Sequence, residues 1–370
     1  MGKYFRSSYY YPDDKDIYDF LSATHAPVDA MLQFLRREGI YVSEKESREH
    51  LWEYISLYYL SWENAEQLVD LVNVRETEEP ATSQTYAWEG PFSDIADAAK
   101  GVQAIRSSRE REVYSIDATT DTITVKVAYV DIENGKTRLL QQREKALSLQ
   151  ILKRDDGFHV RYDNLPRAEA IIQTIIGQLQ EQDQSKEKTE IKGSGIDLSS
   201  ITSAKGRVDF FRKMMDGIAG LDLREVTKIG MERLPGTVIE GDDEEVDEDD
   251  VEETIEKLIV YGHRLWQTPA FQRFVEKGFF VSSATWRSEL KQPTREHVEL
   301  SAGFSAAKEG KGFQYKVQGV FNRDDNGDIR PTRERVTGSL HETLLLGIEE
   351  GAEKALAEVI AEQELQDSHT

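Results

Sequence analysis

The first 75 residues place apolar side chains three and four positions apart, the spacing of one face of an α-helix. This pattern predicts four helices, at residues 16–23, 27–38, 48–60 and 61–72. On the third helix we expect Leu51, Trp52, Ile55 and Tyr59 to share the buried face. The segment is therefore expected to form a compact all-helical unit.

Capping residues support these helix boundaries. Gly39 is suited to end the second helix, because glycine adopts the left-handed conformation that follows many helices. Ser43 or Ser47 can cap the start of the third helix, and Ser61 can cap the fourth. A short extended piece at residues 40–43 is expected between the second and third helices.

From residue 111 onward, apolar and polar residues alternate, which predicts β-strands with one buried face. Turn signals at Asn134-Gly135 and at Asp155-Asp156-Gly157 divide this part into hairpins. Four or five strands are expected, from residues 111–118, 121–132, 136–145, 146–154 and 158–163. An amphipathic helix at residues 165–182 follows, and we expect it to cover the apolar face of this antiparallel meander.

The second half repeats the order of strands followed by a helix. Helical spacing predicts helices within 201–221 and 338–363, and alternation predicts strands within 279–290, 296–310 and 312–336. Residues 227–235 fit either a strand or a helix. We expect the acidic run at 240–253 to be a solvated loop that leads into a helix within 251–278. Its last acids fit the charged start of that helix, since carboxylates stabilise helix N-termini.

Together these elements predict an α+β fold with an N-terminal helical module and two antiparallel sheet-plus-helix domains. The polar segment at residues 76–90 reads as a connector, and a short helix is expected near residues 92–105. The predicted division is 1–75 helical module, 76–110 connector, 111–183 meander plus helix, 184–254 linker, helix and acidic loop, and 255–370 helix, hairpins and C-terminal helix.

The charge of the chain is strongly negative, at −23. By itself this charge disfavours a polyanionic partner. However, residues 240–253 hold eleven acidic residues and no basic one, whereas residues 100–170 hold thirteen lysines and arginines against eleven acids. Residues 200–235 hold seven against five. Two regions are thus slightly basic within an acidic chain.

The sequence has no cysteine and no apolar stretch long enough to cross a bilayer. Disulfides and cysteine-based metal sites are therefore excluded, and we expect a cytoplasmic protein that does not contact membranes. The seven histidines show no metal-ligand spacing, and neither a phosphate-binding loop nor a nucleophile elbow is present. We expect a non-enzymatic protein without a cofactor or metal.

Residues 27–60 resemble SAP-like modules, in which a helix, an extended segment and a second helix together bind DNA. The matching positions are Leu32, Leu35, Gly39, Ile40, Val42, Ser43, Lys45, Arg48 and Leu51. The resemblance implies phosphate binding at the N-terminus of the second helix and at nearby cations. The chain departs from the family at Glu44, where glycine is usual, and at Tyr54, where a basic residue is expected.

These observations predict a nucleic-acid-binding or nucleoprotein-assembly component, an accessory subunit of a prokaryotic or phage-defence system. Cations of the helical module and of the meander are the candidate phosphate ligands, because basic side chains supply most of the affinity for a nucleic-acid backbone. The candidate residues are Arg36, Arg37, Lys45, Arg48, Arg109, Arg111, Lys136 and Arg138. The competing prediction is a protein–protein adaptor or an oligomeric scaffold subunit without nucleic-acid contact.

Overall fold

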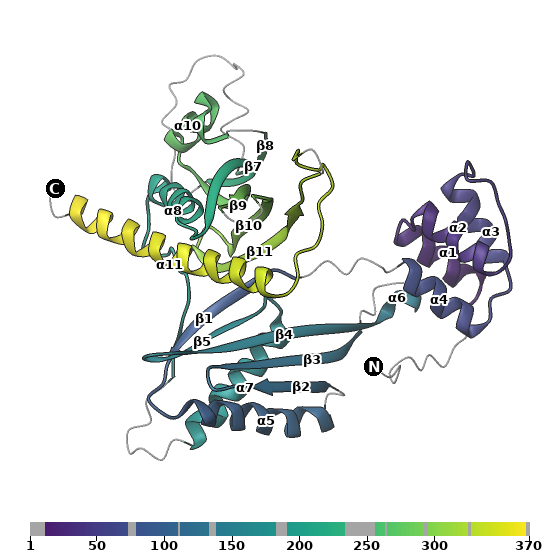
Figure 1. Ribbon diagram of the computed structural model, residues 1–370, viewed down its shortest axis with the longest axis horizontal. Helices are drawn as coiled ribbons and strands as arrows, with labels where there is room; N and C mark the ends of the chain where they lie inside the picture. The colour runs from purple at the N-terminus through teal and green to yellow at the C-terminus, as the bar shows by residue number, and fades with distance from the viewer. Residues whose placement is uncertain are drawn as a thin grey trace. The chain divides into compact units, whose positions relative to one another are not determined.

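The computed structural model describes residues 12–72, 79–109, 112–132, 138–182, 191–233, 256–262, 265–291, 295–324 and 327–367. The chain forms two compact units, each assembled from separate stretches of sequence. The first unit comprises Met1–Glu78, Ile95–Ala118 and Ile123–Ser148, and the second comprises Glu79–Asp94, Thr119–Thr122 and Leu149–Thr370. The fold is α+β, as predicted (Figure 1).

Four helices form the N-terminal part of the first unit, as the sequence predicts. They are α1 (Asp14–Ala23), α2 (Val28–Arg37), α3 (Arg48–Leu57) and α4 (Trp62–Val72). Their apolar faces meet in one core that includes Phe20, Met31, Phe34 and Leu51. Asp13 and Asp16 form a capping box at the start of α1, which satisfies backbone N–H groups that the helix itself leaves unpaired.

The rest of the first unit contains most of one long helix, a strand pair, one helical turn and strand β4 (Gln142–Arg154) as far as Ser148. Besides β4, these are α5 (Phe92–Arg109), β2 (Val113–Ala118), β3 (Thr122–Ile132) and α6 (Arg138–Gln141). Strands β2 and β3 pair antiparallel. The buried carboxylate of Glu112 holds the end of α5 next to β2, because it accepts two hydrogen bonds from Arg106 and one from Tyr114.

The second unit is built on an antiparallel sheet that helices cover on both faces. Its strands are β1 (Ala81–Ala87), β4 (Gln142–Arg154, from Leu149), β5 (Gly157–Asp163), β6 (Gly193–Ser194), β7 (Leu221–Arg233), β8 (Lys257–Tyr261), β9 (Phe279–Leu290), β10 (His297–Ala306) and β11 (Lys311–Phe321). Its helices are α7 (Pro166–Gln182), α8 (Ala204–Asp216), the 3-10 helix Leu265–Gln267, α10 (Pro269–Glu276) and α11 (Ser339–Asp367). The strand order is β4-β5-β1-β11-β10-β9-β7-β8, and β6 pairs with β1.

Strand β1 corrects the prediction of a polar connector at residues 76–90. It pairs with β5 on one side and with β11 on the other, so it joins strands that are far apart in the sequence. This strand was not recognised in the sequence because most of its residues are polar. Their side chains make contacts inside the fold. Thr82, for example, donates a hydrogen bond to the carbonyl of Phe313 at 2.7 Å.

Two further predictions are wrong in detail. Residues 257–261, expected within a helix, form the edge strand β8, and the helix α10 begins only at Pro269 behind an N-cap from Thr268. The alternating apolar residues of β8 pair with β7, and pairing outweighs the helical signal of the acids before it. Residues 138–141, expected in a strand, form the helical turn α6 before β4 begins. The ambiguous segment 227–235 belongs to β7 as far as Arg233.

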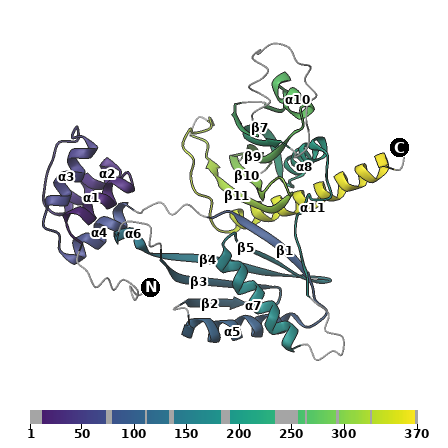
Figure 2. The same ribbon diagram turned by 180° about the vertical axis from the view of Figure 1, so that it is seen from behind.

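Alternation along β5 explains how two helices pack against one strand. Phe158, Val160 and Tyr162 point to one face, where α7 packs (Figure 2). His159 and Arg161 point to the other face and hydrogen-bond to α11. Both sets are buried, so β5 is an interior strand with an apolar face and a polar face.

The main core of the second unit lies between the sheet and the helices α8 and α11, which also pack on each other (Figure 1). Phe210 of α8 contacts Phe304 and Phe313 of the sheet, with ring centroids 5.9 and 6.1 Å apart. Burial of such large rings supplies most of the apolar area that stabilises this unit. None of the helices within the described residues is long and apolar enough to cross a membrane.

We predict that Gly157→Ala destabilises the second unit more than Gly220→Ala does. Both glycines have positive φ, which costs alanine about 1–2 kcal/mol. A Cβ at Gly157 would also lie 1.9 Å from the backbone oxygen of Tyr86, whereas a Cβ at Gly220 meets nothing within 4 Å. Overpacking of this kind costs a further ~1–3 kcal/mol. Urea denaturation of both variants measures the difference, and equal losses would contradict the close approach of the β4–β5 turn to β1.

Candidate functional site

The segment that joins α2 to α3, expected to be extended, has neither helix nor strand over residues 40–43, and a turn follows at Glu44 and Lys45. Helix α2 ends at Arg37, and Gly39 follows with a φ of +76°, which requires a residue that tolerates the left-handed region. Ile40 and Val42 pack against the helical core. Ser47 caps α3 by accepting a hydrogen bond from the backbone N–H of His50 at 3.2 Å. The kinship with SAP-like modules itself stays a prediction.

The four candidate cations of this segment are all exposed, but carboxylates surround them. Arg36 donates to Glu44 at 2.7 Å, and Lys45 lies between Glu44 and Glu46 in the sequence. Residues 12–72 hold thirteen carboxylates and five lysines and arginines. The helical unit therefore brings Arg36, Arg37, Lys45 and Arg48 to one segment without giving it a positive surface.

The other four candidates cannot be placed together. Arg109 ends α5 and Arg138 begins α6, but their side chains lie outside the described residues. Arg111 and Lys136 lie outside the described residues altogether, as do the acidic run 240–253 and the turn at Asn134-Gly135.

The connection between α3 and α4 exposes large apolar side chains that the sequence did not suggest. We expected Tyr59 on the buried face of α3, but the helix ends at Leu57 and Tyr58 is extended, with φ −78° and ψ 132°. As a result, 68% of Leu57 and 86% of Tyr59 are exposed. Tyr54 and Trp62 are exposed as well. We call Tyr54, Leu57, Tyr59 and Trp62 the α3–α4 apolar surface.

The second unit contains a buried carboxylate with partners from two strands. Glu349 of α11, which is 1% exposed, accepts hydrogen bonds from Arg161 at 2.5 and 2.8 Å. The hydroxyl of Tyr315 and the imidazole of His159 also contact it, the latter at 3.2 Å. Arg161 reaches Glu342 at 2.8 Å as well. These bonds connect α11 to β5 and β11.

The pKa values in this cluster follow from burial and pairing. Burial by itself would raise the pKa of Glu349, but hydrogen bonds from Arg161 and His159 outweigh it and lower the pKa to about 2. Burial raises the pKa of Tyr315 well above its ordinary value, and the adjacent Glu349 carboxylate adds to this shift. Glu349 is therefore ionised and Tyr315 neutral at neutral pH.

A relay of hydrogen bonds runs from this cluster to Thr85 of β1. His159 lies opposite Thr85 in the antiparallel pair, and its Nδ1 is 3.0 Å from the Thr85 hydroxyl. Since the Glu349 carboxylate can only accept, His159 donates to it from Nε2.

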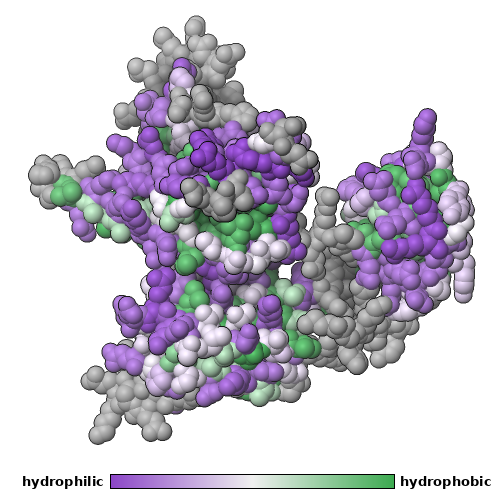
Figure 3. Space-filling model, in the orientation of Figure 1, coloured by the Kyte–Doolittle hydropathy of each residue, from purple (hydrophilic) through white to green (hydrophobic). Residues whose placement is uncertain are grey.

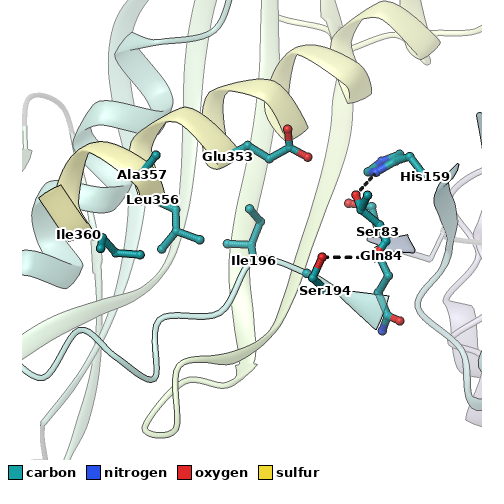
Figure 4. Close-up of a pocket in the computed structure, with 11 residues that line it drawn as sticks. Ser83, Gln84, His159, Ser194, Ile196, Glu353, Leu356, Ala357 and Ile360 are labelled. Atoms are coloured by element: carbon teal, nitrogen blue, oxygen red, sulfur yellow. Dashed lines mark hydrogen bonds between the residues drawn. The ribbon is translucent and has the colours of Figure 1, made fainter. Parts of the chain in front are cut away.

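A cavity of about 420 Å³ adjoins the Thr85 end of this relay. Its walls come from β1, β5, β6, the residues that follow β6, and α11, as Figure 4 shows. The lining residues are Ser83, Gln84, Thr85, His159, Ser194, Gly195, Ile196, Glu353, Leu356, Ala357 and Ile360. The cavity is of ligand size, with hydroxyl groups at one end and aliphatic side chains at the other.

Comparison with known proteins gives no further assignment. The sequence matches no model of a known protein family, and it matches no curated protein. Residue chemistry and geometry are therefore what supports a function.

Neither the cavity nor the α3–α4 apolar surface was predicted from the sequence. The cavity depends on β1, which was read as a connector, and on His159, which was counted among scattered histidines. A signal for the surface was present in the segment from Tyr54 to Trp62, because it holds more apolar residues than one helix face can bury.

We predict that Glu349→Gln destabilises the protein by about 3 kcal/mol, because a buried arginine loses the carboxylate that neutralises it. Glu350→Gln is the matched control: Glu350 is the next residue on α11 and is exposed, so its loss should change stability by less than ~0.5 kcal/mol. Urea denaturation at pH 7 measures both. Equal stability of the two variants would contradict a structural role for the cluster.

The same pair predicts a pH dependence. Between about pH 4.5 and pH 2, the unfolded chain binds a proton at Glu349 that the folded chain does not, so stability falls as the pH falls. Glu349→Gln removes this contribution. The stability difference between wild type and variant should therefore shrink as the pH drops through this window, and a constant difference would argue against a depressed pKa.

The resemblance to SAP-like modules predicts a salt-sensitive gel shift with duplex DNA. Replacing Arg36, Arg37, Lys45 and Arg48 by glutamate should abolish the shift, since each phosphate contact contributes a slope of about −0.9 in log affinity against log salt. The matched control replaces four exposed lysines of the second unit, Lys205, Lys291, Lys311 and Lys354. Equal binding by both quadruple variants would exclude the helical module as the DNA contact.

Proposed function

We propose that this chain is a protein-binding adaptor whose N-terminal helical unit docks a basic, amphipathic segment of a partner protein. The observation that carries the proposal is the α3–α4 apolar surface on a unit rich in carboxylates. Aromatic and aliphatic side chains grouped on a surface are typical of protein interfaces, where tyrosine and tryptophan supply much of the binding energy.

The α3–α4 apolar surface is held by a packed framework. Leu51 and Ile55 of α3 are fully buried in the helical core, and Trp52 packs edge-to-face on Tyr18 of α1 with ring centroids 6.3 Å apart. Tyr54 and Leu57 lie three residues apart, so they share the outer face of the same helix. A partner would therefore meet side chains that are already oriented, which lowers the entropy cost of binding.

The charge of this region favours a basic partner. Between residues 48 and 72, the chain has five carboxylates and a single cation, Arg48. The carboxylates are Glu49, Glu53, Glu63, Glu66 and Asp70. Such a field attracts a segment with lysine or arginine around an apolar face, and it repels a phosphate backbone. In Figure 3 the visible face of the helical unit is mainly hydrophilic, with hydrophobic residues between.

An amphipathic peptide with leucine on one face and lysine on the other is a suitable probe for the full chain. We expect it to bind, with affinity that falls as salt rises, whereas a peptide with glutamate in place of lysine should not bind. Leu57→Ser combined with Tyr59→Ser should weaken binding at least tenfold, a loss typical of interface anchors. Tyr261→Ser is the control, because Tyr261 is an exposed aromatic residue of the second unit.

Fluorescence anisotropy of the labelled peptide gives these affinities. Three outcomes would overturn the proposal: equal binding of both peptides, unchanged binding by the Leu57/Tyr59 variant, or a DNA gel shift lost on replacing the four cations of the helix–extended–helix segment. A fourth outcome that would overturn the proposal comes from light scattering. If the wild type self-associates and the Leu57/Tyr59 variant does not, the α3–α4 apolar surface binds a second copy of the chain.

A further inference from the structure

The cavity in the second unit has a polar end and an apolar end, and this division indicates what kind of ligand fits it. Its polar end is formed by β1 and β6, and its apolar end by α11 and Ile196, so the two ends lie along the direction of α11 (Figure 4). Seven residues of α11 separate Glu353 from Ile360, roughly 10 Å at 1.5 Å per residue. An elongated ligand with one polar end fits such a site.

The polar end offers acceptors. The Ser83, Thr85 and Ser194 hydroxyls line it, and Ser194 donates to the backbone oxygen of Thr85 at 3.2 Å. Because Ser194 donates to a backbone oxygen, its own hydroxyl oxygen remains an acceptor toward the cavity. Gln84 contributes no amide here, because its side chain points away from α11 in Figure 4.

Glu353 is the one carboxylate among the residues that line this described cavity. It forms an ion pair with Arg154 at 3.9 Å, which is longer than a hydrogen bond. Glu349, one turn earlier on α11, differs because Arg161, His159 and Tyr315 saturate it. The Glu353 carboxylate therefore has acceptor capacity, and the hydroxyl oxygens beside it suit a donor with several N–H groups.

The apolar end is aliphatic. Leu356 and Ile360 of α11 are half-buried and face the cavity together with Ile196 and Ala357 (Figure 4). Leu356 and Ile196 also pack against the main core, which fixes their positions. Covering these side chains with a hydrocarbon chain would remove apolar surface from water and stabilise the complex.

We propose that this cavity binds a small straight-chain aliphatic amine as its ammonium ion. The ammonium group pairs with Glu353 and donates to the hydroxyls of β1 and β6, and the hydrocarbon chain lies along Leu356 and Ile360. The site belongs to the second unit alone, so it is independent of the partner docking proposed for the helical unit.

Isothermal titration calorimetry of the full chain with n-hexylammonium tests the proposal. We expect saturable binding that is at least tenfold tighter than that of n-hexanol, with no binding of n-hexanoate. Glu353→Gln should weaken binding about 10- to 100-fold, the range for a charge-assisted hydrogen bond. Glu350→Gln should leave the affinity unchanged, because Glu350 lies on the same helix and does not line the cavity.

A second variant tests the apolar end without touching the charge. Ala357 is exposed on the wall of the cavity, so Ala357→Phe fills the apolar end while leaving the main core intact, and it should abolish binding. The proposal is wrong if hexylammonium does not bind at millimolar concentration, if hexanol binds as tightly, or if Glu353→Gln binds like wild type. Unchanged thermal unfolding of each variant confirms that the fold is retained.

Discussion

The pairing of Glu349 with Arg161 is the interaction on which the second unit depends. A carboxylate and a guanidinium that are both buried must neutralise each other, since either one left alone would cost several kcal/mol. This requirement fixes how α11 rotates and where it lies along the sheet. The imidazole of His159 and the hydroxyl of Tyr315 complete the hydrogen bonds of Glu349, so β5 and β11 are held in register by the same helix.

The same pairing shapes the cavity. Because Glu349 is tied to the sheet, the next turn of α11 carries Glu353 and Leu356 over the end of β1, and the space between them stays open. A polar strand face in the interior of a protein is otherwise unfavourable, and here Thr85 and His159 satisfy each other. The polar residues of β1 thus make contacts inside the fold, and some of these residues also line the cavity.

Sequence periodicity predicted most elements, because the four N-terminal helices and α11 each expose one face to solvent, and β9 and β11 alternate between buried and partly buried residues. It missed β1 for the opposite reason: a strand with Ser83 and Thr85 turned to a polar interior shows no apolar alternation. It also placed Tyr59 inside the helical core, because spacing alone does not show that α3 ends at Leu57. The candidate cations were visible in the sequence, whereas their pairing, as of Arg36 with Glu44, was not.

The electrostatics of the helical unit separate the two partner classes. Binding DNA requires cations whose positive potential extends beyond their nearest carboxylates, and Arg36 is already paired with Glu44 in a region of net negative charge. Docking a basic protein segment requires a negative potential around an apolar surface. The carboxylates of α3 and α4 would supply that potential around the α3–α4 apolar surface. Net negative charge opposes contact between copies of the chain through these exposed aromatic side chains. Negative charge would thus both prevent self-association and select the partner.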